Sequence, residues 1–175
     1  MDRRFFAMLV GAVAGVGLAR GAWSAPEDVQ AGCEGAVAAL KGWLKALASR
    51  DFDYLEQHLA SDFQFTFTPN LISPGADGGV KDKPGFIEQD RHVYNSDIRI
   101  QGLTARRMGD LVVTVVFAHI ANEEFRGDLG TGLPSASQMN AGIHGKTLGY
   151  ASGWRERNGL WQCTSHHVLG AVNQG

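Results

Sequence analysis

The histidines are the side chains of this sequence best suited to proton transfer near neutral pH. His119 interrupts an otherwise apolar run, residues 111–121. His166 and His167 are adjacent in the last apolar segment. Because side chains alternate along a strand, only one of this pair can face a pocket. His167 shares its parity with Cys163, on the expected core side, and is the one that we expect to face inward.

His119 and His167 are therefore the candidate catalytic bases. A buried imidazole at position 119 requires a hydrogen-bond partner, and Asp90 or Asp97 could provide it. A histidine–carboxylate pair facing a cavity would indicate an enzyme of lyase or isomerase type. The alternative is a structural histidine, satisfied in the core or at its rim.

The sequence predicts neither a metal nor a cofactor. No histidine or cysteine spacing on one element is typical of a metal site. Residues 142–147 end in Gly-Lys-Thr like a phosphate-binding loop, but Asn140 stands where the first glycine would be. No helix is predicted to follow and offer its N-terminus to a phosphate.

The composition is that of one globular domain without a nucleic-acid partner. The chain has 175 residues, 44% of them hydrophobic and 19% charged, enough apolar side chains for a packed core. Its 16 Lys and Arg against 18 Asp and Glu give a formal charge of −2 without a basic block. Electrostatic binding of nucleic acid needs a concentrated basic face, so we expect none.

The N-terminus resembles an export signal. Arg3 and Arg4 precede an apolar run, residues 5–18, which is too short to span a membrane. Small residues at Ala22 and Ser24 favour cleavage after Ser24. The Arg-Arg-x-Phe pattern also resembles a twin-arginine signal. We therefore expect residues 1–24 to be a signal peptide and 25–175 a single domain, located in a bacterial periplasm or secreted, with no membrane contact after cleavage.

Export would expose the two cysteines to an oxidising compartment. Cys33 and Cys163 are then candidates for one disulfide, and the alternative is two buried free thiols.

Apolar spacing predicts three helices in the first part of the mature chain. Apolar residues recur every three or four positions over 29–49, Asp51 can cap a second helix, and Pro84 suits the first turn of a third. Between the last two, phenylalanines alternate with polar residues over 63–68, as in a half-buried strand.

The rest of the chain is predicted to form β-strands, interrupted by one polar loop. Strands are expected over 97–108, with a bulge or bend at Gly102, and over 111–121, 146–157 and 160–169, the last two joined by an Asn-Gly hairpin turn. Residues 123–142 are Gly-rich and polar and are expected to form a loop. Helices first and strands last indicate an α+β domain, with a curved antiparallel sheet wrapped around three N-terminal helices.

Three segments together resemble the NTF2-like superfamily, in particular its SnoaL-like (polyketide cyclase-like) branch. They are residues 39–53 (a long helix, an Arg-Asp break and a second helix), 59–63 (an acid-containing turn into a strand) and 153–167 (a hairpin with Trp and a His-bearing strand). The last is also similar to the association domain of calmodulin-dependent kinase II. The resemblance implies a cone-shaped fold with an interior pocket, and no particular activity.

The cone leads to three functional hypotheses. In the first, the domain binds a small apolar or aromatic molecule, with Trp43, Phe67, Tyr94 and Trp154 lining the pocket. The second is the lyase or isomerase already named, with an inward histidine as general base. The third is a dimeric interaction domain without a ligand, because open sheets of this fold commonly pair face to face. A homodimer is expected in any case.

Overall fold

The computed structural model describes residues 27–67, 79–129 and 135–172. The expected signal peptide, residues 1–24, lies outside these ranges. Within them, no helix combines the length and the apolar character needed to cross a bilayer.

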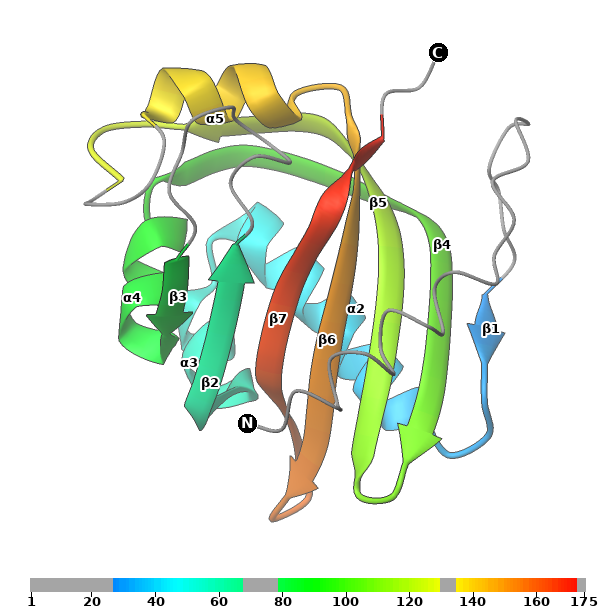
Figure 1. The fold of residues 1–175 in the computed structure, drawn as a ribbon. Coiled ribbons are helices and arrows are strands. Elements are labelled where there is room, and N and C mark those ends of the chain that lie inside the picture. The colour runs from blue at the N-terminus through cyan, green and yellow to red at the C-terminus, as the bar shows by residue number, and fades with distance from the viewer. Residues whose placement is uncertain (1–26, 68–78, 130–134, 173–175) are drawn as a thin grey trace.

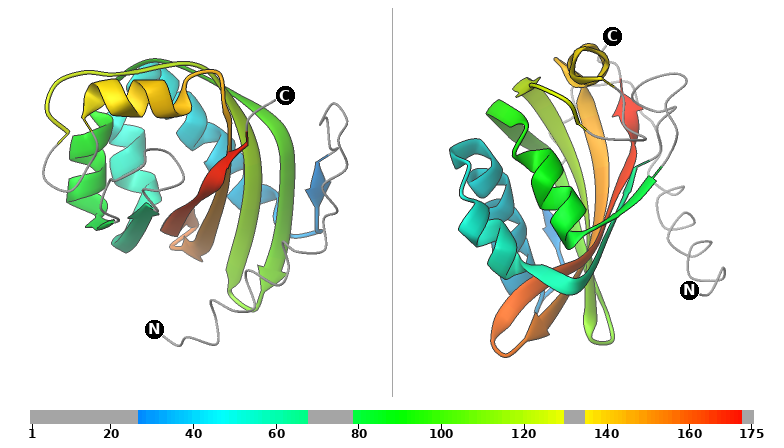
Figure 2. Two further views of the ribbon diagram at one scale, coloured as in Figure 1. Left: turned by 45° about the horizontal axis from the view of Figure 1, so that its top comes forward. Right: turned by 90° about the vertical axis from the view of Figure 1, so that its left-hand side faces the viewer.

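Three helices precede the long strands, as expected. They are α2 (Glu34–Ser49), α3 (Phe52–His58) and α4 (Lys83–Asp90). α2 ends at Arg50, whose left-handed φ of 58° turns the chain, and the Asp51 carboxylate then accepts a hydrogen bond from the Tyr54 backbone N–H at 3.0 Å. This cap starts α3 directly after α2. Figure 2 shows the three helices together on one side of the sheet.

α2 begins five residues later than the sequence pattern suggests, because the segment before it is a short strand, β1 (Asp28–Val29). β1 runs parallel to a long strand and pairs with Thr104 and Ala105. The Gln30 side-chain oxygen also accepts a hydrogen bond from the Arg107 backbone N–H. The start of the described chain is thereby fastened to the sheet edge.

The sheet has seven strands in the order β1-β4-β5-β6-β7-β2-β3. The remaining strands are β2 (Leu59–Phe67), β3 (Gly79–Asp82), β4 (Val93–Met108), β5 (Leu111–Phe125), β6 (Thr147–Arg157) and β7 (Leu160–Val172). The sheet is mainly antiparallel, with parallel pairs β1–β4 and β2–β7. Figure 1 shows β4 and β5 bending over the helices, which gives the cone.

Local sequence explains two bends in this sheet. Asn158 and Gly159 both have positive φ values, 55° and 76°, as a two-residue hairpin turn between β6 and β7 requires. The pairing of β4 with β5 shifts register between Ile100 and Gly102, so the expected irregularity at Gly102 is present.

A fourth helix, α5 (Ala136–Ile143), replaces part of the loop expected over 123–142. Ser135 and Gln138 form a reciprocal capping box at its start. The Asn140 side chain exchanges two hydrogen bonds with the backbone of Phe125, at 2.7 and 3.0 Å. α5 is thereby held against the end of β5, across one end of the cone (Figure 1).

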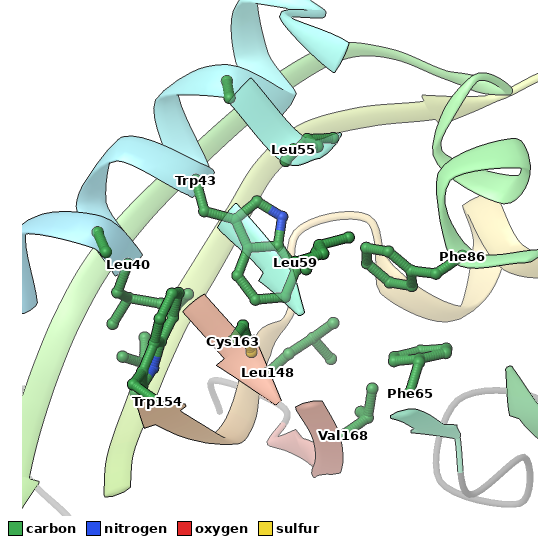
Figure 3. Packing of buried hydrophobic residues seen from close by; sticks show 14 of the residues in the cluster. Leu40, Trp43, Leu55, Leu59, Phe65, Phe86, Leu148, Trp154, Cys163 and Val168 are labelled. Atoms are coloured by element: carbon green, nitrogen blue, oxygen red, sulfur yellow. The ribbon is translucent and has the colours of Figure 1, made fainter. Parts of the chain in front are cut away.

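The core lies between α2 and the concave face of the sheet. Trp43 of α2 meets Trp154 of β6 edge to face, with ring centroids 5.9 Å apart, and Trp154 is fully buried. Figure 3 shows Phe65 and Phe86 on the opposite side of Trp43 from Trp154. Aromatic rings therefore fill the interior on both sides of Trp43.

Candidate functional site

His166, and not His167, faces the helices. β6 and β7 shift register beside Trp154: Trp154 pairs with Cys163, but Gly153 pairs with Ser165. This bulge adds one residue to β7 and changes the face on which the following side chains lie. His166 consequently lies inward and buried with Cys163, and the expectation that His167 would share that face is wrong.

The His166 imidazole is held by a hydrogen bond to one ring nitrogen and by aromatic rings packed around it. Its Nδ1 atom lies 2.8 Å from the Ser152 hydroxyl, in a hydrogen bond between neighbouring strands. Its ring stacks on Tyr150, with centroids 5.2 Å apart, and lies 4.6 Å from the Trp43 ring. Burial, and secondarily the neighbouring His167, lowers the pKa of His166 to about 3, so the imidazole is neutral at physiological pH.

Glu123 is turned inward by a second irregularity. The inward residues of β5 alternate as far as Ile120, which pairs with Ile98, but the next pair joins Asp97 to Asn122. The skipped residue shifts the alternation, and Glu123 points to the concave side. The Ser96 hydroxyl donates to its carboxylate at 3.0 Å. Burial raises the pKa of Glu123 to about 7, despite the opposing effect of this hydrogen bond.

Asp90 and Tyr150 complete a group that we call the inward cluster: Asp90, Glu123, Tyr150 and His166. Asp90, the last residue of α4, is 7% exposed, and its Oδ2 atom has no hydrogen-bond partner. Burial, followed by repulsion from Glu123, raises the pKa of Asp90 well above its usual range, and Lys81 of β3 opposes this. Burial and both carboxyls raise the pKa of Tyr150.

The cluster combines groups in complementary protonation states at neutral pH. Tyr150 holds its proton, the pKa of Asp90 is raised well above its usual range, and Glu123, with a pKa of about 7, can give up or accept a proton. Glu123 and Tyr150 are both half-buried, so part of each residue remains accessible. The arrangement can bind a polar group and exchange a proton with it.

Open grooves occur elsewhere on the described surface. One of about 600 Å³ lies beside β2 and β3 and includes Lys81 in its lining. Another, of about 480 Å³, lies between α2 and β4. Neither is lined by a member of the inward cluster. Across residues 27–67, 79–129 and 135–172, no three His, Cys, Asp or Glu side chains gather in a way that could hold a metal.

His119 lies on the opposite, convex face of the sheet. Its neighbours Ala118 and Ile120 are the buried, inward residues of this part of β5. Of its two proposed partners, Asp97 is the one that interacts electrostatically with His119, and Asp97 is also paired with Arg99 at 2.7 Å. Asp90 belongs to the inward cluster. The structure therefore does not place His119 with an inward carboxylate.

The four expected pocket residues occupy different environments. Trp154 is core, and its indole N–H donates to the Thr114 hydroxyl at 3.0 Å. Trp43 is buried between that core and His166. Tyr94 lies outside the cone, with the guanidinium groups of Arg50 and Arg126 at 4.1 and 4.5 Å from its ring, so the pocket role expected for it does not fit its position.

Phe67 ends β2, and its side chain lies outside the described part of the structure.

The two cysteines are buried and unbridged, which agrees with the alternative of two free thiols and not with the candidate disulfide. Cys33 lies at the start of α2, and the Cys163 thiol donates to the Ser165 carbonyl oxygen at 3.2 Å. Burial raises the pKa of Cys163, so its thiol stays protonated.

Sequence reasoning missed Glu123 and Tyr150, and it considered Asp90 only as one of two alternative partners for His119. Tyr150 lies at an inward position of β6, opposite Val116, and could have been found from alternation with Trp154. Glu123 follows a bulge that the residue types of the strand do not predict.

Comparison with known proteins identifies the fold. No protein-family model and no curated protein matches the sequence. Among solved structures, an NTF2-like protein from Cytophaga hutchinsonii is 18% identical, with a TM-score of 0.61 over 82% of this chain and 100% of that one. An NTF2-like protein of unknown function in nutrient uptake from Rhodospirillum rubrum is 22% identical, with a TM-score of 0.56 over 78% and 98%.

A third similar structure, from Shewanella frigidimarina, is named as a candidate ketosteroid isomerase. It is 14% identical, with a TM-score of 0.53 over 81% of this chain and 98% of that one. At these identities the likeness concerns the backbone alone and carries no activity. The strand order, the bent sheet and these neighbours agree: the chain has the NTF2-like fold.

Proposed function

We propose that this domain binds a small apolar or aromatic molecule at the inward cluster. The strongest support is the combination of several buried aromatic rings with a buried carboxyl oxygen that has no hydrogen-bond partner. The rings of Phe65, Phe86 and Tyr150 all contact His166. Asp90, whose Oδ2 atom has no hydrogen-bond partner, lies within electrostatic range of Tyr150.

Such a combination costs stability without a ligand. An unpaired buried polar group typically costs about 1–3 kcal/mol, and desolvation of two carboxyls adds to this. A ligand with an apolar body and a polar group would fill the aromatic side and satisfy the polar one. The polar cluster favours a binding domain over a purely structural one.

Ligand-induced thermal stabilisation, screened across small aromatic molecules, tests the proposal. Tyr150→Phe removes one hydroxyl from the cluster, and we expect it to weaken binding about fivefold, the equivalent of about 1 kcal/mol. Tyr94→Phe is the matched control, because Tyr94 lies outside the cone. A ligand whose affinity changes in neither variant, or equally in both, binds elsewhere and contradicts the proposal.

A second candidate function is general acid–base catalysis, with Glu123 as the base instead of an inward histidine. A carboxyl with a pKa of about 7 is matched to proton transfer at physiological pH, whereas His166 is too weak a base. If a ligand is turned over in a lyase or isomerase reaction, Glu123→Gln should lower kcat by about 10²–10⁴. Full activity in that variant would exclude Glu123 as the base.

For the assembly we propose a homodimer formed through the convex face of the sheet. Val113, Val115 and Phe117 alternate along β5 on the face opposite α2, and the exposed Leu169 lies two strands away. These apolar side chains would be covered in a dimer. Phe117→Glu should then give a monomer in sedimentation experiments, and an unchanged species would contradict this interface.

Export of the mature domain is likewise our proposal, tested by N-terminal sequencing of the secreted protein.

A further inference from the structure

With both of its carboxyls ionised, the inward cluster would face more negative than positive charge. Two carboxyls, Asp90 and Glu123, lie within electrostatic range of each other. Among the described residues, Lys81 is the cation that attracts Asp90. Tyr150 and His166 are neutral at physiological pH and supply no compensating charge. If both carboxyls were ionised, one negative charge would remain uncompensated among the described residues.

We infer that the ligand of the inward cluster carries one positive charge, as a protonated amine on an aromatic or apolar body. This inference rests on the proposed function, since it names the class of molecule bound at the same site. One added cation, together with Lys81, would balance the two carboxylates.

The hydrogen-bonding groups of the cluster suit an ammonium. An ammonium has three N–H donors and needs acceptors. The Asp90 Oδ2 atom is unpartnered, and Glu123 accepts a hydrogen bond from Ser96 at one of its two oxygens, Oε2. The Tyr150 oxygen is a further possible acceptor. The site therefore offers acceptors from three elements: α4, β5 and β6.

The aromatic rings suit a cation as well. Tyr150 and His166 are stacked, and Trp43 lies on another side of His166. Faces of tyrosine and tryptophan attract a cation most strongly where water is excluded, and the same rings pack against an apolar body. Trp43 itself is fully packed, so the half-buried Tyr150 ring is the surface that could hold both parts of an aromatic amine.

An anionic ligand fits this interior poorly. Arg50 and Arg126, which could have bound a carboxylate, lie outside the cone against Tyr94. Ser152 occupies an inward position on β6, where it bonds His166 and contributes no charge. Two carboxyls would repel an added negative charge.

Binding of a cation should be linked to proton release. The free protein holds a proton on Glu123 about half of the time at pH 7, because burial raises the pKa of that carboxyl to about 7. A bound ammonium favours the ionised carboxylate and expels this proton. Affinity should therefore increase by about tenfold between pH 6 and pH 8 if one proton is released, and by more if Asp90 also ionises.

Three probes of similar shape separate charge from shape: 2-phenylethylamine, 2-phenylethanol and phenylacetate. Calorimetric titration of the full mature domain at pH 6 and pH 8 should show the amine binding at least tenfold more tightly than either of the others at pH 8. Repeating the titration at pH 6 in buffers of different ionisation enthalpy should reveal release of about one proton, whereas little release is expected at pH 8, where Glu123 is already ionised.

Matched variants locate the effect. Glu123→Gln should abolish the pH dependence and most of the preference for the amine. Glu124→Gln is the control, since Glu124 is exposed and paired with Arg126, and it should leave both unchanged. Preferential binding of the alcohol or of phenylacetate would overturn the charge assignment and leave the proposed function standing. Failure of all three probes to bind would contradict both.

Discussion

Ser152 and His166 form a hydrogen bond of 2.8 Å inside the cone, between the Ser152 hydroxyl and the imidazole Nδ1. Both residues are buried, and they face each other across the β6–β7 pair. The bond fixes the orientation of an imidazole that Tyr150, Phe65 and Trp43 surround with aromatic surface. Ser152 thus acts as a positioning residue for His166.

Ser152→Ala should destabilise the domain by about 1–3 kcal/mol, because one buried ring nitrogen loses its partner. Urea unfolding of the two proteins measures the difference. Ser61→Ala, at an exposed serine, is the control and should change stability by less than about 0.5 kcal/mol. Equal effects of the two substitutions would show that the Ser152–His166 bond contributes nothing to stability.

Gly42 lies within α2 where alanine would normally be preferred. A Cβ atom at this position would lie 2.0 Å from the Tyr54 hydroxyl oxygen and 2.5 Å from the adjoining ring carbon. Tyr54 cannot move freely, since its ring stacks on His58 at 3.8 Å and its hydroxyl donates to the Ala39 carbonyl oxygen. The usual gain of about 0.5–1 kcal/mol from Gly→Ala in a helix should therefore be reversed.

We expect Gly42→Ala to lower the free energy of unfolding by about 1–3 kcal/mol, as overpacking does. In a Tyr54→Ala background the same substitution should become neutral or stabilising, because the obstructing ring is gone. A destabilisation of the same size in both backgrounds would mean that Tyr54 is not the cause.

The pH dependence of the free energy of unfolding should show the raised pKa of Glu123. Its pKa in the folded protein is about 7, against an ordinary value of 4.5, so the folded state holds this proton more tightly than the unfolded state. The contribution to stability is complete below pH 4.5 and is lost as the pH rises through 7. The loss amounts to about 3 kcal/mol, from a shift of about 2.5 pH units.

Glu123→Gln removes this contribution, so the variant should gain about 3 kcal/mol relative to the wild type between pH 4.5 and pH 8. His166 contributes in the opposite direction, since its folded pKa of about 3 is depressed and its stabilising effect grows between pH 3 and 6.5. That contribution is common to both proteins and cancels in the difference. A difference between the two proteins that stays constant with pH would contradict the raised pKa of Glu123.

Strong local signals made much of the fold predictable. The Asp51 cap, the Asn158–Gly159 turn and the irregularity at Gly102 each follow from the chemistry of one or two residues, and each is present. The extent of β4 and β5 was underestimated, because their ends carry polar residues on a strand that bends over the helices.

The site was less predictable, because it depends on sheet register. The rule of alternation holds only while the pairing is regular, and a single extra residue reverses it. Because of the bulge beside Trp154, His166 faces inward instead of His167. Because one residue is skipped after Ile120, Glu123 also faces inward. Long-range strand pairing sets these bulges, so the residue types of one strand do not reveal them.

The most direct test of the inward cluster is the titration of the Glu123 side-chain carboxyl, followed by ¹³C NMR on the mature domain labelled at glutamate. Absence of its signal from Glu123→Gln assigns it. The structure predicts a midpoint near pH 7, well apart from the exposed glutamates. A midpoint near the ordinary value of 4.5 would show that Glu123 lies in water, and the enclosed acid–base site would be contradicted.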